Sequence, residues 1–385
     1  MHEKVYRKLQ RHLDKQTIGF PATRSGVELN ILKHIFNPSE AELTSHLSYK
    51  FDTVTAIYEK VKHLVESKED LEVNLDRIMK KGGLELKTKK GVKHYCCSPL
   101  VVGMYEFQIE RLTPGFIQDF KNYASTKSFG LDFISTKVPQ MRTIPVKQSI
   151  QAHLSVSTFD EIISLLNDAD GPFVILQCIC RKKKQLEGYS CKATNRNETC
   201  LAVDNMAEMS LASKIGRKIS KDEAISIIDK NQEEGLILQP SNTKKAEFLC
   251  SCCGCCCGVL NMHKHLPKPL NYWAANYFAV VNHESCLGCG LCEDLCQVDS
   301  IKVSDRQQIA IIDLDRCLGC GNCVRKCPSE SITLYKKENE IIPPQTREEL
   351  NKVIMEHKKG KFGKLLLAGN LIFETIKTGQ THLLR

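Results

Sequence analysis

Two stretches near the end of this 385-residue chain repeat the same spacing of four cysteines. Residues 286–296 read CLGCGLCEDLC and residues 317–327 read CLGCGNCVRKC, so both follow the pattern C-x2-C-x2-C-x3-C. Each cysteine recurs 31 residues further on, as Cys286 does at Cys317, and several Leu, Gly, Ser and Ile positions recur at the same interval. An internal repeat of this kind indicates a duplicated structural unit.

Cysteines at this spacing have a specific metal chemistry. Three of them in one tight loop bind three irons of a [4Fe–4S] cubane, and the fourth begins a helix that leads to the other half of the repeat. Glycines between the cysteines let the backbone approach a cluster closely and direct N–H groups at its sulfurs. The repeat therefore predicts two [4Fe–4S] clusters, and it argues against zinc or disulfide bonds at these thiols.

Residues 277–336 resemble a bacterial-type ferredoxin domain with two [4Fe–4S] clusters. The resemblance implies that each cluster takes three cysteines from one run and the fourth from the other. The family usually has a proline after the fourth cysteine of each run, which fits Pro328, whereas Gln297 departs from the rule. The departure bears on the local turn and potential and leaves ligation intact. The two implied ligand sets are Cys286, Cys289, Cys292 and Cys327, and Cys317, Cys320, Cys323 and Cys296.

A second group of cysteines lies upstream of the repeat. The segment CSCCGCCCG at residues 250–258 holds six thiols, too many for one ion. Because Cys250, Cys253 and Cys256 are spaced C-x-x-C-x-x-C, we expect them to bind three corners of one cluster. A fourth ligand could come from four preceding cysteines, which could instead form a site of their own. These four are Cys178, Cys180, Cys191 and Cys200.

The sequence leaves open which metal these central cysteines bind. The neighbouring repeat favours one or two further iron–sulfur clusters. Zinc is the competing metal, since four cysteines commonly hold a structural zinc ion. Redox-active or unbound thiols are the remaining alternative. The nearby His263 and His265 are not needed as ligands.

Composition limits the class of protein. The chain has 20 cysteines, all between Cys96 and Cys327, which points to metal ligands and not to a small secreted disulfide scaffold. The formal net charge of +9 is no argument for a nucleic-acid partner, because thiolate-bound clusters add negative charge. No apolar run approaches the ~18 residues of a membrane helix, and the charged start MHEKVYRKLQRHLDK is no signal peptide. We therefore expect a cytoplasmic protein without an integral membrane segment.

The elements that position these cysteines fall into four expected domains, and the expected fold class is α+β multidomain. Residues 1–112 combine helical periodicity with a hairpin that has a basic tip, which favours a winged helix-turn-helix. Residues 113–265 alternate helices with buried strands and form a cysteine-rich α/β domain. Residues 270–340 form the ferredoxin-like dicluster domain, and residues 341–385 form a helical tail.

A winged helix commonly binds DNA through its second helix, which we expect over residues 69–81, and through its hairpin. Here that helix opens with Glu69 and Asp70, whose carboxylates would repel DNA phosphates. A docking or dimerisation module is therefore favoured, with DNA as the alternative partner. The whole arrangement is similar to winged-helix, cysteine-rich, ferredoxin-domain proteins of anaerobic bacteria and archaea, a resemblance that implies an architecture and no activity.

These observations favour an electron-transfer protein, or an electron-transfer subunit of an oxidoreductase. Its two clusters would exchange single electrons with a redox partner protein and with a further centre at the central cysteines. The alternatives are a redox-responsive DNA-binding regulator and an enzyme with a catalytic cluster within residues 178–257. The chain has no P-loop, dinucleotide fingerprint or nucleophile–base signature, so catalytic residues are undefined by the sequence. The oligomeric state and pathway are likewise undefined.

Overall fold

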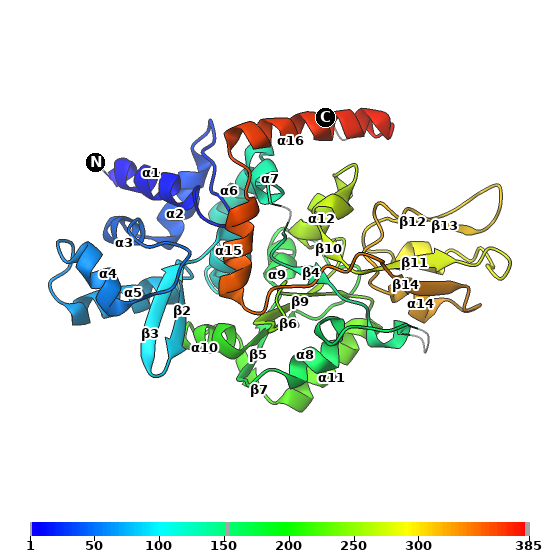
Figure 1. Cartoon of the computed structure of the whole chain (residues 1–385), viewed down its shortest axis with the longest axis horizontal. Helices are drawn as coiled ribbons and strands as arrows, with labels where there is room; N and C mark the ends of the chain where they lie inside the picture. Colours follow the sequence, from blue (N-terminus) through cyan, green and yellow to red (C-terminus); the bar gives the residue numbers. More distant parts are fainter. Residues whose placement is uncertain (1, 137, 151–153, 382–385) are drawn as a thin grey trace. The chain divides into compact units, whose positions relative to one another are not determined.

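The computed structural model of the chain, drawn in Figure 1, describes residues 2–136, 138–150 and 154–381. The chain divides into two compact units, each assembled from separate segments. The first unit contains Met1–Thr136, Asn205–Arg217 and Asn351–Lys364, and the second contains Lys137–Asp204, Lys218–Leu350 and Leu365–Arg385. Part of the expected cysteine-rich domain thus belongs to the first unit.

The first unit begins with helices and a small antiparallel sheet. Strand β1 (Asp52–Thr53) pairs with the second strand of a hairpin, so the strand order is β1-β3-β2. The hairpin expected from the sequence is present as β2 (Leu84–Lys89) and β3 (Val92–Cys97). The helices around the sheet are α1 (His2–Leu13), α2 (Val27–Ile35), α3 (Pro38–Thr44), α4 (Val54–Val61) and α5 (Lys68–Lys80).

Buried Asp132 ties distant segments of the first unit together. Its carboxylate accepts a hydrogen bond from the Gly19 N–H at 2.5 Å and pairs with Lys364 and, at 3.8 Å, with Lys358. A buried carboxylate needs such partners because desolvation penalises its charge. The unit is completed by η1 (Leu100–Met104), η2 (Glu106–Gln108), α6 (Pro114–Ala124) and α7 (Lys127–Phe133), and by most of α10 (Asp204–Ala212) and α15 (Arg347–His357).

A five-stranded sheet with the order β7-β5-β6-β9-β8 forms the centre of the second unit. Its strands are β5 (Phe173–Gln177), β6 (Glu198–Val203), β7 (Arg217–Ile219), β8 (Ile237–Pro240) and β9 (Phe248–Cys252). Helices α8 (Ile162–Asn167) and α11 (Lys221–Glu233) lie on one side of it, and α9 (Ile179–Leu186) lies on the other (Figure 1). Leu201, Leu249 and Ile228 belong to one apolar core between the sheet and the first two helices.

The ferredoxin-like part of the second unit consists of two antiparallel strand pairs and two short helices. Strand β11 pairs with β14, and β12 pairs with β13. The elements are β11 (Tyr277–Val281), α13 (Leu291–Leu295), β12 (Ile301–Val303), β13 (Ala310–Ile312), α14 (Asn322–Lys326) and β14 (Ile332–Lys336). The remaining elements are β4 (Arg142–Thr143), β10 (Ala274–Ala275), α12 (Gly258–Lys264), η3 (Lys147–Ser149), η4 (Thr158–Asp160) and η5 (Pro269–Asn271).

A buried ion pair holds this part against the sheet. The Arg142 guanidinium lies 3.0 Å from the Asp160 carboxylate, and the Asn276 side chain, just before β11, donates to the other carboxylate oxygen at 2.8 Å. Arg142 also donates to the backbone oxygen of Thr243 at 3.0 Å. Because the pair is desolvated, removing either charge would leave the other uncompensated. The ion pair therefore fixes where the ferredoxin-like part begins.

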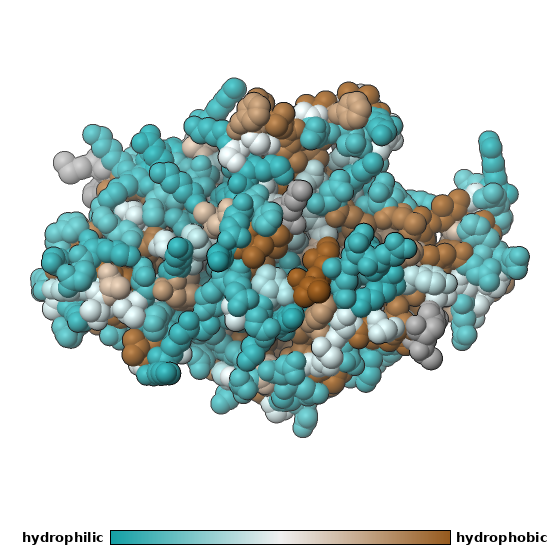
Figure 2. Space-filling view, viewed as in Figure 1, coloured by the Kyte–Doolittle hydropathy of each residue, from teal (hydrophilic) through white to brown (hydrophobic). Residues whose placement is uncertain are grey.

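The last helix, α16 (Lys361–Lys377), carries apolar side chains that face solvent. Phe362 is 74% exposed, and Leu365 and Phe373 are similarly exposed. Figure 2 shows hydrophobic residues gathered over this helix. Among the described residues, no helix is both long and apolar enough to cross a membrane.

His263 on α12 has an environment that disfavours its charged form. Its ring is fully buried, meets Trp273 edge-on with ring centroids 5.2 Å apart, and has no hydrogen-bond partner among the described residues for either nitrogen. Burial, reinforced by the charges of Arg316 and Lys264, lowers the pKa of His263 to about 3. The imidazole is therefore neutral at neutral pH.

We predict that this histidine makes the fold sensitive to mild acid. Below the ordinary histidine pKa of about 6.5 the unfolded chain takes up a proton that folded His263 does not, so stability falls by up to about 1.4 kcal/mol per pH unit. Thermal unfolding without oxygen at pH 7.5 and 5.5 measures this loss. His263→Leu should flatten the pH dependence, whereas His283→Leu, at an exposed position, should not. Equal pH dependence in all three proteins would contradict the prediction.

Candidate metal centres

The two cysteine runs of the repeat adopt the same backbone conformation. Gly288 and Gly319 both have φ of +61°, and Gly290 and Gly321 have φ of +81° and +79°. A side chain at Gly288 or Gly319 would come within 2.1 or 2.2 Å of a backbone oxygen. Positive φ and such close approach both require glycine. The recurring glycines therefore shape two equivalent loops around the cysteines.

Each loop meets the fourth cysteine of the other run. One cavity is lined by Cys286, Cys289 and Cys292 together with Cys327. At the second loop, the thiols of Cys317, Cys320 and Cys323 each interact electrostatically with Cys296. This grouping is the one that the resemblance implies. Four thiols around a glycine-lined loop fit a [4Fe–4S] cluster in both places.

Hydrogen-bond donors surround the sulfurs of the exchanged cysteines. The Ser300 N–H donates to Cys296 Sγ at 3.2 Å, and the Ser331 hydroxyl lies 3.3 Å from Cys327 Sγ, four residues on in each case. Burial raises the pKa of Cys327, but hydrogen bonds from Ser331 and Ser329 outweigh it and lower the pKa below its usual value. Such donors stabilise a thiolate and tune the potential of a cluster that it binds.

Four central cysteines form a tight group, which we call the four-thiol site. The sulfur of Cys191 lies 3.5 Å from that of Cys253 and 3.7 Å from that of Cys255, which in turn lies 3.6 Å from that of Cys256. All four sulfurs lie within 4.8 Å of one another. Thiolates bound at ~2.3 Å to one tetrahedral ion have their sulfurs about 3.8 Å apart. The group thus has the dimensions of a site for a single ion.

The surroundings of the four-thiol site favour a thiolate at Cys191, whereas the hydrogen bond to Cys191 raises the pKa of Cys253 and burial raises that of Cys256. The Cys253 thiol hydrogen-bonds the Cys191 sulfur and lowers the pKa of Cys191 to about 4. Cys253 and Cys256 pack with fully buried Leu236, which keeps water from one side of the group. A readily ionised thiol among dry neighbours is a good metal ligand.

The spacing predicts that Cys250 binds one cluster with Cys253 and Cys256. In the structure, Cys250 lies apart from these two residues. Residues on a strand alternate between its faces, so Leu249 and Ser251 face α11 while Cys250 and Cys252 face the other way. The chain leaves β9 at Cys252, and within this segment only the residues after Cys252 reach the four-thiol site. Cys255 takes part instead, a residue that spacing alone did not select.

The other six central cysteines form a closed circuit of neighbouring thiols, which we call the six-thiol ring. Each thiol interacts with two others. Cys178, Cys180 and Cys200 were expected to supply a fourth ligand to the cluster of Cys250 or to form a site with Cys191, which lies in the four-thiol site instead. Cys252 and Cys257 had no expected role. In order around the ring the members are Cys178, Cys180, Cys257, Cys252, Cys250 and Cys200.

A direct contact joins the ferredoxin-like part to the loop of the four-thiol site. The Gly254 N–H, between Cys253 and Cys255, donates to the Gln297 side-chain oxygen at 2.7 Å. A side chain on Gly254 would meet the Gln297 backbone oxygen at 2.0 Å, so the loop requires glycine here. Nearby, the Lys264 ammonium lies 2.9 Å from the Asp299 carboxylate. The residue that departs from the family proline rule therefore makes this contact.

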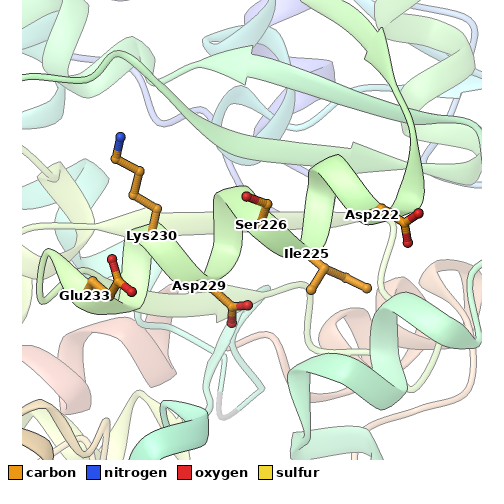
Figure 3. A pocket seen from close by; sticks show the side chains of 6 residues that line it. All are labelled: Asp222, Ile225, Ser226, Asp229, Lys230 and Glu233. Carbon is orange, nitrogen blue, oxygen red and sulfur yellow. The ribbon is translucent and has the colours of Figure 1, made fainter.

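A hollow over α11 is unrelated to these centres. Figure 3 shows its lining, which comes from one helix and contains no cysteine. Asp222, Asp229 and Glu233 make it acidic, with Lys230 beside them. Charged side chains on the solvent face of a helix explain it without a ligand.

Comparison with known families agrees with the geometry of the repeat. Residues 279–334 match a family model described as a 4Fe-4S dicluster domain, and residues 309–361 match a second model with the same description. No curated protein and no solved structure matches the chain significantly. The C-terminal part of the chain therefore contains a ferredoxin-like iron–sulfur domain.

Proposed function

We propose that this protein transfers single electrons between a redox partner protein and a metal centre at its central cysteines, by way of two [4Fe–4S] clusters. Such clusters, when bound, supply one-electron carriers of low potential. The protein acts as a carrier or as the electron-transfer subunit of an oxidoreductase. The ligands are the two exchanged sets of four cysteines given above.

The contact between Gly254 and Gln297 is the observation that carries the proposal. Gln297 directly follows Cys296, a member of the second ligand set, and Gly254 lies between two cysteines of the four-thiol site. The covalent bonds of these residues and one hydrogen bond thus form a continuous path between the sulfurs of two centres. A ferredoxin-like part that served only an external partner would have no need of this connection.

Exposure of the cysteines supports a direction of flow. Cys289 of the first ligand set is exposed, and its neighbour Leu287 is 69% exposed. In the second set, by contrast, Cys317 and Cys323 are buried. A partner would therefore meet the first set, and the second set would pass electrons on to the interior. Each step moves one electron, oxidises the donor centre, reduces the acceptor centre and breaks no bond.

The first unit supports a docking role more than a DNA-binding one. Its order of strand, two helices and hairpin suggests a winged helix, in which α5 would enter the DNA groove. Lys93 on the hairpin is 2.8 Å from both Glu72 and Asp76 of α5. Arg77 of α5 pairs with buried Glu40 at 2.9 Å. Cations that would bind phosphates are thus already paired, and further carboxylates lie on the same helix.

We predict that Gln297→Ala slows electron exchange between the ferredoxin-like domain and the central centre several-fold, because it removes the Gly254 hydrogen bond. Metal content should not change, since Gln297 is not a ligand. Rapid reduction of the protein, followed by the optical spectra of the two centres, separates the phases. Pro328→Ala, at the equivalent position of the repeat, is the matched control. A parent protein with no second kinetic phase would contradict the proposed function.

We also predict no binding of duplex DNA tighter than the ordinary non-specific range, about 10⁻⁴ to 10⁻⁶ M, at physiological salt. The paired cations of α5 and the hairpin are the reason. Fluorescence anisotropy of a labelled duplex of mixed sequence, with oxidised and with reduced protein, measures this. Salt-sensitive retention that changes with oxidation would favour the regulator over the docking module.

A further inference from the structure

We propose that the six-thiol ring holds a polynuclear iron–sulfur cluster, and that this centre is separate from a single ion in the four-thiol site. The central region then contains two metal centres of different kinds. The proposal deepens the electron-transfer function by naming the redox centre that adjoins the four-thiol site through the neighbouring pairs Cys252–Cys253 and Cys256–Cys257. The role of this centre depends on the proposed electron-transfer function. Its presence does not.

The spread of the sulfurs separates the two kinds of centre. Within the described part of the chain, the four-thiol site is the only group of three or more His, Cys, Asp or Glu whose ligand atoms all lie within 4.8 Å of one another. When a single ion binds several sulfurs at ~2.3 Å, every pair of these sulfurs must lie close together. In the six-thiol ring no three sulfurs lie that close together, so the ring is spread more widely than the ligands of one ion.

The ferredoxin-like domain provides an internal standard for this comparison. Its two ligand sets match a family of cluster-binding domains, and they too fall outside the class of tight groups. A cluster spreads its terminal ligands because each thiolate binds a different iron. The six-thiol ring therefore resembles the sets that bind clusters and differs from the site that fits one ion.

The ring lies on the face of the sheet that is opposite the apolar core. Leu201 of β6 pairs with Leu249 of β9, and both face the apolar core. Cys200, one residue before Leu201, and Cys250, one residue after Leu249, therefore share the opposite face. Cys252 lies two residues beyond Cys250 on that face, and it accepts a hydrogen bond from buried Gln239 at 3.4 Å. Burial of Cys178 and Cys257 closes the ring from the side of α9 and α12.

Arg181 provides independent evidence that the ring carries negative charge. The side chain is 1% exposed, and no carboxylate among the described residues forms an ion pair with it. Two of its nitrogens donate to the Thr199 hydroxyl and, at 2.7 Å, to the Ser251 backbone oxygen, while Nε has no partner among the described residues. A buried guanidinium without an anion is costly. The guanidinium therefore requires a negatively charged group close by.

The cysteines are the groups that can supply this anion. The guanidinium charge acts on Cys178 and Cys200 of the ring and on Cys191 and Cys253 of the four-thiol site. Neutral thiols would leave Arg181 uncompensated. A cluster with four or more thiolate ligands carries net negative charge, and each thiol that binds iron releases its proton. Arg181 thus lies where one cation can compensate both centres.

Metal analysis of the loaded, full-length protein tests the proposal. In protein purified without oxygen we expect about four irons and matching sulfide beyond the about eight of the two ferredoxin-type clusters. One further ion per chain, without sulfide, should accompany them. Iron and sulfide of only about eight per chain would overturn the proposal. This result does not depend on electron flow, so the proposed function can fail while the ring cluster is present.

Two matched variants assign the metals to their sites. Cys252→Ser in the ring should lose iron and sulfide together and keep the single ion. Cys255→Ser in the four-thiol site should lose the single ion and keep the sulfide. Low-temperature electron paramagnetic resonance of the reduced ferredoxin-type clusters should be unchanged in both and confirms that each variant is folded. Loss of the same metal in both variants, or full iron in Cys252→Ser, would refute the assignment.

A second test addresses Arg181 as a positioning residue and counter-ion. Arg181→Gln removes the buried charge, so the ring cluster should be lost or should shift to a more negative midpoint potential. Arg181→Lys keeps the charge and should hold the parent potential more closely. Redox titration followed by electron paramagnetic resonance measures the shift. A parent-like potential in Arg181→Gln would show that the cation does not act on the ring.

Discussion

The pairing of β6 with β9 is the constraint on which the central region depends. One register, with Leu201 opposite Leu249, sends apolar residues toward α8 and α11 and cysteines to the other face of the sheet. A shift of one residue would exchange the two sets, burying thiols in the apolar core and exposing leucines. Because that core is extensive, it strongly favours the observed register. Hydrophobic burial on one face therefore determines the placement of the cysteines on the other.

Arg181 reinforces the same pairing through polar contacts. It donates hydrogen bonds to Thr199, which precedes Cys200, and to Ser251, which lies between the two cysteines of β9. Asn231 of α11 bonds to the same two residues, at 2.9 Å to the Thr199 carbonyl and 2.8 Å to the Ser251 hydroxyl. The ends of the two strands are thus held from both faces. Ligands presented on such a rigid support need little reorganisation when a metal binds.

The repeat and the central cysteines differ in how far sequence can predict them. In the repeat, each set of three ligands lies in one glycine-shaped loop, so spacing alone carries the geometry, and the matched family agrees. In CSCCGCCCG the chain changes from a strand to a turn and then to α12. Nothing in the spacing marks Cys252 as the last strand residue, which is why Cys250 was grouped with Cys253. The roles of Cys255 and Arg181 likewise depend on contacts with residues far away in sequence.

Gln297 illustrates how a departure from a family pattern acquires a physical meaning. Proline at this position would shape the turn, but its side chain could not accept a hydrogen bond from Gly254. The glutamine accepts one, and the glycine allows the two backbones to approach within reach. Exposure decreases from Cys289 at the surface to the buried Cys317 and Cys323, and Cys178, Cys252 and Cys257 of the six-thiol ring are buried as well. Burial excludes water and oxygen and strengthens the action of nearby charges such as Arg181, so the interior centre is the one whose potential the protein itself can control most closely.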